Sequence, residues 1–351
     1  MARRPVERGG IVGGVDTHRD LHTAAVVTLE GTVLGTESFP TTRAGYRAMP
    51  RWFRSHGRLL RVGVESTGSY GAGIARHLGL SGVPVLEVTG PDPAARRARG
   101  KDDALDAVAA AEAARTGCRV QVAKDRGGAM EAPRVLRTTR KTAVKSRRAA
   151  PQQLHNTIVA APDEVRDRIR DLTRMRRLRV CAAWRPDATR SRDPAVATRL
   201  SLKSLARGVL ALDEEIAALD RHIAPLVEEL APDLLALEGV GVASAGEPMV
   251  AAGENPGRLR SEASFAMLCG ACPLPASSGK TRRHRLNRGG NRQANSALHM
   301  IVVCRMRTDQ RTRDYVERRT REGLSKREVM RCLKRYVARE VYRVLTAPPP
   351  A

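Results

Sequence analysis

The sequence predicts an α/β domain at its amino-terminal end, a helical and coiled-coil middle, and a mainly α carboxy-terminal domain. Three observations support this prediction: short apolar segments separated by turn residues over 11–88, an alanine-rich segment at 103–116, and regularly spaced leucines over 202–230. A chain of 351 residues can form two or three domains of ordinary size. We expect domains at 1–125, 126–232 and 233–346, followed by a tail at 347–351.

The first 116 residues alternate between apolar segments of strand length and longer helical segments. The predicted strands cover 11–16, 22–29, 32–39, 60–65 and 83–88, and the predicted helices cover 42–55, 70–80 and 103–116. Gly31 provides a turn between the second and third strands, and Thr42 can cap the first helix. Three strands joined by turns, followed by alternating helices and strands, are typical of an α/β domain of the ribonuclease-H type.

The middle of the chain is basic and helical over 133–185, and a linker or loop is expected at 186–196. Nine apolar residues then follow in steps of three and four over four repeats: Leu202, Leu205, Val209, Leu212, Ile216, Leu219, Ile223, Leu226 and Leu230. This heptad seam predicts helix pairing, either between two subunits or in a hairpin within one chain. We expect Pro225 to kink or split the helix, because its ring clashes with the preceding turn.

The carboxy-terminal segment begins near Asp233 and reads Leu-Glu-Gly-Val-Gly-Val at 237–242. That pattern is typical of a helix-hairpin-helix turn whose glycine amides face a phosphate, and equally of a simple helix end. Pro248 lies where the next helix should run, which indicates a weakened core. No acid occurs between Glu262 and Asp309, and the helices that follow carry arginine on nearly every turn.

The charge of the chain points to a polyanionic partner. Lys and Arg number 62 against 37 Asp and Glu, which gives a formal net charge of +25 and a pI near 11.1. Such an excess is typical of proteins that bind nucleic acid. No segment is apolar enough to span a membrane, and no apolar signal segment follows the start. We therefore expect a cytoplasmic, nucleoid-associated protein.

Four carboxylates are predicted to meet at one edge of the amino-terminal sheet. Asp16 and Glu65 end two strands that are neighbours in a ribonuclease-H sheet. Asp103 and Asp106 are three residues apart near a helix start, so they share one helix face. Four clustered carboxylates repel one another unless cations neutralise them, and oxygen ligands are what Mg²⁺ prefers. We therefore predict a site for Mg²⁺ or Mn²⁺, two of which can assist phosphodiester exchange.

Structural roles for these acids are the alternative. Asp103 can cap its helix and complement the helix dipole, and Glu65 can pair with an arginine. Asp20 and Asp102 lie nearby, and we assign them no role. The order of the four acids on these particular elements favours the metal site over separate structural roles.

A second candidate site lies in the acid-free loop after Ser277 and Ser278. Six of the thirteen residues from 280 to 292 are basic: Lys280, Arg282, Arg283, Arg285, Arg288 and Arg292. Glycines at 279, 289 and 290 allow the backbone to approach a phosphate closely. A serine hydroxyl in such surroundings can attack a phosphodiester, with the arginines stabilising the developing charge. Alternatively, Ser278 only donates a hydrogen bond in a solvated phosphate-binding loop.

Four motifs together resemble the bridge-RNA-guided insertion-sequence transposases. They are "GVDTHRDLHTAAVV", "VGVESTGSYG", "RARGKDDALDA" and "PASSGKTRRHRLNRGGNRQAN", and they follow the order of that family along nearly the whole chain. The resemblance implies a RuvC-like DEDD domain whose quartet is Asp16, Glu65, Asp103 and Asp106. It also implies a carboxy-terminal transposase domain whose catalytic serine precedes a glycine, which here is Ser278 before Gly279, with Ser277 adjacent.

The resemblance further implies an RNA-guided DNA transposase or recombinase that cleaves and rejoins DNA through a phosphoserine link. Its partners would be DNA, a structured guide RNA, and further copies of the chain in a dimer or tetramer. Two rival functions remain: a metal-dependent junction nuclease that forms no covalent intermediate, and a nucleic-acid-binding protein without activity. The acidic quartet argues against mere binding, because acids weaken the affinity for a polyanion unless a metal is present.

Overall fold

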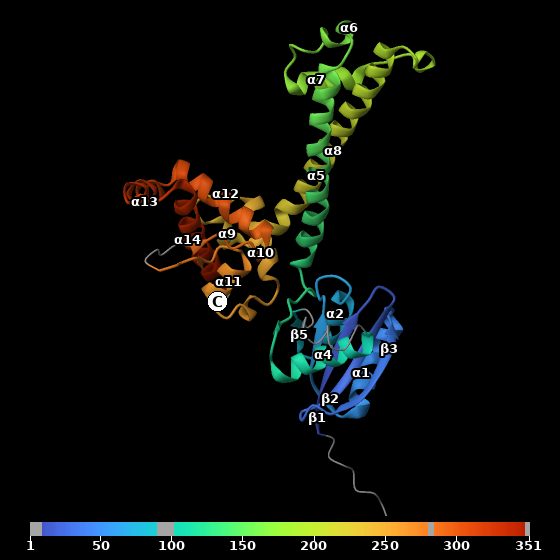
Figure 1. Cartoon of the computed structure of the whole chain (residues 1–351), viewed down its shortest axis with the longest axis vertical. Helices are drawn as coiled ribbons and strands as arrows, with labels where there is room; N and C mark the ends of the chain where they lie inside the picture. Colours follow the sequence, from blue (N-terminus) through green and yellow to red (C-terminus); the bar gives the residue numbers. More distant parts are fainter. Residues whose placement is uncertain (1–8, 90–101, 280–283, 348–351) are drawn as a thin grey trace, which may run out of the picture. The chain divides into compact units, whose positions relative to one another are not determined.

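A computed structural model of the chain describes residues 9–89, 102–279 and 284–347, and Figure 1 traces its helices and strands. Within the described residues, two compact units are formed. One comprises residues 1–131 together with 247–351, and the other comprises 132–246.

The amino-terminal part of the first unit contains a mixed β-sheet. Its strands, counted over the described residues, are β1 (Gly10–Thr17), β2 (Leu21–Thr28), β3 (Val33–Pro40), β4 (Arg58–Glu65), β5 (Val85–Val88) and β6 (Val120–Val122). They lie in the order β3-β2-β1-β4-β5-β6. The β1–β4 and β4–β5 pairs are parallel and the other pairs are antiparallel. This arrangement is consistent with the predicted ribonuclease-H-like domain, although β6 was not predicted because it is only three residues long.

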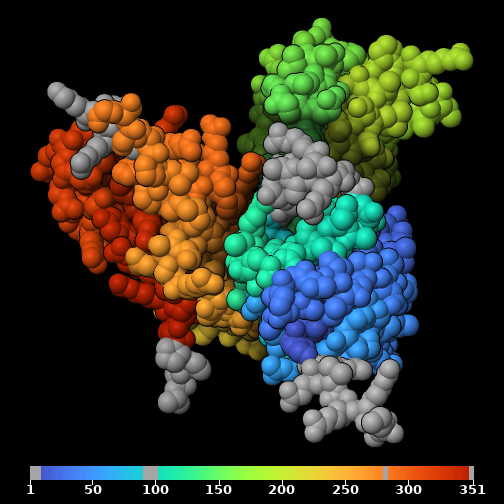
Figure 2. All heavy atoms as spheres, turned by 60° about the horizontal axis from the view of Figure 1, so that its bottom comes forward, coloured from blue at the N-terminus to red at the C-terminus, as the bar shows by residue number. Residues whose placement is uncertain are grey.

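Helices cover both faces of this sheet. Helices α1 (Arg43–His56) and α2 (Ala72–Leu80) pack on one face, where Phe53 and Ile74 meet Ile11 and Val15. Helix α4 (Asp103–Thr116) packs on the other face, where its alanines meet Val12 and Val27. The alternation follows from the strand period of two, which sends neighbouring residues of β1 to opposite faces. The strands and α4 form one packed block, blue to teal in Figure 2.

The second unit is a helical hairpin with a small apolar end. Its elements are α5 (Glu131–Val159), α6 (Asp163–Arg166), α7 (Arg174–Ala183), the short 3₁₀ turn η1 (Ala188–Arg190), α8 (Pro194–Leu230) and α9 (Pro232–Leu235). Arg140 Nη2 donates to Asp220 Oδ2 at 2.9 Å, and Arg147 Nη1 to Asp213 Oδ1 at 2.6 Å. The paired residues increase in number along α5 and decrease in number along α8. The two helices are therefore antiparallel, as Figure 1 also shows.

Two predictions for this region need adjustment. Pro225 was expected to kink or split the helix, and the helix is not split, because α8 runs through Pro225 as one element. The expected loop at 186–196 ends earlier, because α8 begins at Pro194 with the Asp193 side chain accepting from the Ala195 amide at 2.9 Å. Proline suits the first helical turn, where its missing N–H has no partner to lose.

The heptad seam on α8 is covered within the single chain at its central positions. Leu202 and Val209 are fully buried, and Ile216 and Ile223 are 7% and 1% exposed. Leu202 and Val209 pack in one core with Leu154 and Ile158 of α5 and with residues of α7. The hairpin alternative therefore accounts for the buried part of the seam.

The carboxy-terminal part of the first unit is mainly helical. It contains α10 (Val242–Ala252), η2 (Pro256–Arg258), α11 (Glu262–Leu268), the strand pair β7 (Leu274–Pro275) and β8 (His284–Arg285), α12 (Arg292–Thr308), α13 (Gln310–Arg321) and α14 (Lys326–Thr346). Gly239, at a φ of 73°, lies in the turn between α9 and α10. Pro248 lies inside α10, which is continuous from Val242 to Ala252. None of the helices described combines the length and apolar composition needed to span a membrane.

Candidate active site

The edge of the sheet where β1 and β4 end brings the first two acids together. The strands are parallel, with Val15 beside Val64, so Asp16 and Glu65 come next on neighbouring strands. Thr17 Oγ1 donates to the Glu65 carbonyl at 3.2 Å and ties the two strand ends. Asp16 is only 5% exposed, whereas Glu65 is half-buried.

Helix α4 brings two further acids to the same edge. Asp103 and Asp106 both lie in its first turn. His18 Nε2 is 3.1 Å from Asp16 Oδ2 and 3.1 Å from Asp103 Oδ1. One ligand atom from each of Asp16, His18 and Asp103 can be chosen so that all lie within 4.8 Å of one another. Asp106 is buried and acts electrostatically on Asp16. The structure thus gathers Asp16, Asp103 and Asp106, with Glu65 next to Asp16 along the sheet edge.

Glycines in the strands allow α4 to lie this close. A Cβ atom on Gly14 would lie 2.1 Å from the Ala111 amide and 2.2 Å from the Ala107 carbonyl. A Cβ atom on Gly63 would lie 2.4 Å from the Ala110 carbonyl. Because real Cβ contacts are never this short, only glycine fits at these two strand positions. The close approach sets the position of the first turn of α4, and with it the position of Asp103 and Asp106.

The start of α4 excludes the structural alternative in which Asp103 caps the helix. Asp102 is the N-cap, and its side chain accepts a hydrogen bond from the Ala104 amide at 2.8 Å. Asp103 is therefore not the cap, and Asp102 has a structural role that the sequence did not reveal. Because Asp102 satisfies the helix end, the carboxylate of Asp103 is left to face His18.

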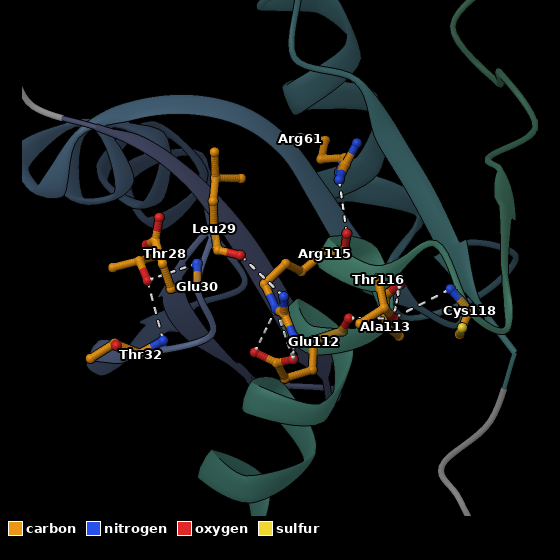
Figure 3. Close-up of polar contacts among 10 residues, drawn as sticks. All are labelled: Thr28, Leu29, Glu30, Thr32, Arg61, Glu112, Ala113, Arg115, Thr116 and Cys118. Carbon is orange, nitrogen blue, oxygen red and sulfur yellow. Dashed lines mark hydrogen bonds and ion pairs between the residues drawn. The ribbon is translucent and has the colours of Figure 1, made fainter.

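The opposite end of α4 is fastened to the sheet by Arg115 (Figure 3). Arg115 binds both carboxylate oxygens of Glu112 one turn earlier, and its Nη1 donates to the Leu29 carbonyl at 3.1 Å. Arg61 Nη2 in turn donates to the Arg115 carbonyl at 2.9 Å, which gives a partner to a carbonyl at the helix end. These contacts fix the helix axis on the sheet, so the acids at its first turn have a defined position.

The electrostatics of the cluster favour a bound cation. Burial raises the pKa of Asp16, the charges of Asp103 and Asp106 raise it further, and His18 opposes the rise. Asp16 Oδ2 and His18 Nε2 are buried atoms with no hydrogen-bond partner among the described residues, although they lie 3.1 Å apart. The ligand atoms of Asp16, His18 and Asp103 lie within 4.8 Å of one another, which fits a divalent metal ion. Carboxylates suit Mg²⁺ and Mn²⁺, and an imidazole shifts the preference toward transition metals.

Sequence reasoning missed His18, although a signal was present. His18 follows Asp16 by two residues at the end of an extended strand, and side chains at that spacing lie on the same face. It also missed the unusual backbone after Glu65, where Ser66 has a φ of 49°. A left-handed conformation at a non-glycine residue is strained and is common beside functional sites. Nothing in the sequence identifies that conformation.

We predict that His18→Ala weakens Mn²⁺ binding by about tenfold or more, because it removes a nitrogen ligand from the cluster. The loss of affinity for Mg²⁺ should be smaller, since Mg²⁺ prefers oxygen ligands. Titration of Mn²⁺ into the whole protein, with free Mn²⁺ followed by electron paramagnetic resonance, measures this directly. His155→Ala changes an exposed histidine on α5 and serves as the control. Equal Mn²⁺ affinity in both variants would exclude His18 as a ligand.

The basic loop lies on the carboxy-terminal part of this unit. Ser277, Ser278 and Gly279 are exposed and follow β7, which pairs with β8 through Leu274 and Arg285. Gly279 has a φ of 54° and Gly290 a φ of 79°, so both use the backbone freedom of glycine. Of the predicted basic residues, Arg285, Arg288 and Arg292 are exposed, while Lys280, Arg282 and Arg283 lie outside the described residues.

Comparison with protein families gives two matches. A family model described as a transposase, of the DEDD IS110 type, matches residues 13–162, which include all four predicted acids. A second model, described as the transposase IS116/IS110/IS902 family, matches residues 231–317, which include Ser278 and the basic loop. Comparison with curated proteins returned no match.

Proposed function

We propose that this enzyme, a DNA transposase or recombinase with IS110-family transposase domains at both ends, moves an insertion sequence by cleaving and rejoining DNA strands. The observation that carries the proposal is the cluster of Asp16, His18 and Asp103, whose ligand atoms converge inside the matched DEDD domain. The neighbouring Asp106 and Glu65 complete a set of donors suited to divalent metal.

In the proposed site, Asp16, Glu65, Asp103 and Asp106 would hold the metal and His18 would supply a nitrogen donor. A divalent metal bound here would neutralise charge on a phosphodiester and polarise it. The protein contributes orientation: the two strand ends hold Asp16 and Glu65, and the fixed axis of α4 holds Asp103 and Asp106. Burial of Asp16 limits access of water to one side of the cluster and strengthens its interaction with a cation.

A DEDD-type metal site can cleave DNA with water as the nucleophile, so this domain alone does not require a serine. We nevertheless propose that Ser278 is the nucleophile for strand exchange. Its support is its exposed position before Gly279, the basic residues that follow it, and the motif resemblance. In the proposed step a bond forms between Ser278 Oγ and phosphorus, and one P–O bond to deoxyribose breaks. The serine proton passes to the released deoxyribose oxygen, and the number of phosphate ester bonds is conserved, which allows rejoining.

We also propose that a structured RNA guides the enzyme and that the chain works as a dimer or tetramer. The net charge of +25 exceeds what a small metal site needs, and it suits the backbone of a folded RNA, which proteins recognise mainly by shape and phosphate contacts. Basic surface on the carboxy-terminal helices offers such contacts, because α13 carries Arg318, Arg319 and Arg321 in its last turn. Half-buried seam residues such as Leu212 and Leu219 on α8 leave apolar surface for a second copy.

The test of the proposed function is a search for a covalent protein–DNA adduct. Wild-type protein, guide RNA and labelled DNA are mixed, denatured and separated by size. Ser278→Ala should bind nucleic acid normally, because one hydroxyl is lost among many basic contacts, and should form no adduct. Ser277→Ala should retain the adduct, because a displacement of about 1 Å can cost on the order of 100-fold in rate and the two hydroxyls are not interchangeable.

Other outcomes lead to specific corrections. Loss of the adduct in Ser277→Ala alone would identify Ser277 as the nucleophile in place of Ser278. Cleavage without an adduct in wild type and in both variants would replace the serine mechanism by the junction nuclease. Cleavage at the same sites with and without RNA would exclude guidance by RNA.

A further inference from the structure

A cavity of about 690 Å³ lies in the carboxy-terminal part of the first unit, between the segments 270–273 and 284–287 and helices α13 and α14. Its walls include six cationic side chains: Arg285, Arg319, Arg331, Lys334, Arg335 and Arg339. Among the described lining residues Glu328 is the single acid, and it already accepts from the Ser325 amide at 2.9 Å in a helix cap. The cavity is therefore strongly cationic and separate from the acidic cluster.

Lys334 is the most unusual member of this set. Its side chain is buried at 7% exposure, and its Nζ donates to Asn295 Oδ1 at 3.1 Å. No carboxylate in the described part of the chain lies within ion-pair distance of it. Burial lowers the pKa of Lys334, and the nearby charge of Arg331 lowers it further. A buried ammonium group without a counter-charge is unfavourable, and an anion bound in the cavity would relieve it.

Three of the arginines that line the cavity with Lys334 are held in place by ion pairs with glutamates. Glu262 accepts from Arg335 Nη2 at 3.0 Å and forms an ion pair with Arg339 Nε at 2.7 Å, and Glu322 pairs with Arg319. Even so, Arg319 Nε and Arg335 Nη1 are buried and have no hydrogen-bond partner in the described structure. Counting Glu262, Glu322 and Glu328 against the six cations leaves three positive charges in excess. Donors and charge both exceed what the protein itself can satisfy.

We infer that this cavity binds one nucleotide of a nucleic-acid strand, with its phosphate at Lys334 and the surrounding arginines. Cationic side chains with spare donors suit a phosphate better than a carboxylate, because phosphate offers more acceptor oxygens. The volume falls in the range of sites for small ligands, about 300–1,000 Å³, so it admits one nucleotide but no duplex. Tyr336 and Leu324 also line the cavity and offer surface for a base, as in sites that take up single-stranded nucleotides.

That the nucleotide belongs to a strand rests on the proposed function, because a transposase encounters DNA strands and RNA. That the cavity binds a phosphate does not rest on the proposed function. The test uses the full chain and two probes: deoxyadenosine monophosphate and a short fluorescent single-stranded oligonucleotide. Calorimetry measures the first and anisotropy the second, and inorganic phosphate should compete with both. Lys334→Met keeps the length of the side chain and removes its charge. It should weaken the binding of both probes by about tenfold or more, as expected for a lost charged hydrogen bond.

Lys326→Met is the matched control, because Lys326 lies on the same helix, is exposed and does not line the cavity. It should change affinity for the mononucleotide by less than about twofold, as expected for an exposed charge. Should Lys334→Met lower Tm strongly, Arg331→Gln provides the same comparison. Arg331 lines the cavity, and its ion-pair partner among the described residues is Glu328 at 3.9 Å, so its loss should leave the fold intact.

Three results decide the inference. Unchanged mononucleotide affinity in Lys334→Met and Arg331→Gln would mean that the cationic cluster is structural, and would overturn it. Binding of the mononucleotide without competition by the oligonucleotide would point to a free nucleotide and overturn the strand as source. If the cavity binds nucleotide but the wild type forms no adduct and cleaves no DNA, the proposed function fails while the cavity site stands.

Discussion

Asp103→Ala should reduce DNA strand cleavage by more than about 100-fold while leaving nucleic-acid binding intact. Asp103 contributes one of the three ligand atoms that converge with Asp16 and His18, so its loss opens the proposed metal site. The fold should survive, because the Asp103 side chain is 52% exposed and Asp102, not Asp103, caps α4. Cleavage of labelled DNA with Mg²⁺ or Mn²⁺ measures the activity, and a gel-shift titration measures binding.

Asp20→Ala is the control for that variant. Asp20 is also an acid close to Asp16 in the chain, but its side chain is 88% exposed and its nearest charged partner is Arg19, at 3.9 Å. Its removal changes net charge equally without touching the cluster, so cleavage should stay near the wild-type rate. Wild-type cleavage that persists in excess chelator, or an active Asp103→Ala variant, would remove the metal mechanism.

Gly14→Ala should destabilise the amino-terminal domain by about 3 kcal/mol or more, since the added methyl group meets backbone atoms that cannot rotate away. The Ala111 amide and the Ala107 carbonyl would lie 2.1 and 2.2 Å from the new Cβ, so α4 must move off the sheet. Denaturant unfolding of the whole protein measures the loss, provided that the first transition is assigned by tryptophan fluorescence. Trp52 lies in this domain and packs against its core.

Gly79→Ala is the matched control, because nothing lies within 4 Å of a Cβ atom added there. Gly79 lies in α2, where alanine favours the helix by up to about 1 kcal/mol. The control should therefore be as stable as wild type or slightly more stable. The folded fraction of Gly14→Ala should also bind Mn²⁺ more weakly, because α4 carries Asp103 and Asp106. Equal stability of the two variants would show that α4 is not seated as described.

The meeting of Asp16 and Glu65 at the sheet edge could be predicted from the sequence, because it depends only on strand order and on the strand period. Asp16 and Glu65 end parallel neighbours, so their proximity follows once β1 and β4 are adjacent. The helix at 103–116 was equally clear from its alanines. The cap was not, because Asp102 and Asp103 are chemically identical candidates, and only the extended backbone at 102 decides between them.

Other features depended on tertiary packing that no local pattern encodes. A heptad seam buries the same stripe against a partner helix in its own chain or in another copy. The ion pairs from Arg140 and Arg147 to α8 identify α5 as a partner within the chain. Pro225 was expected to kink or split α8, and the helix is not split, because burial of residues such as Ile223 and Val227 on either side outweighs one lost hydrogen bond.

The contact between α4 and the sheet is made largely by glycine and alanine, and this has a consequence for rigidity. Alanine and glycine lose no side-chain conformational entropy when buried, and they have no rotamers that could interconvert. Gly14 and Gly63 therefore meet Ala107, Ala110 and Ala111 with a single possible geometry. Such an interface buries little apolar area, so it contributes modestly to the free energy of unfolding. Its contribution is positional precision: thermal repacking of side chains cannot shift the acids of α4 relative to Asp16.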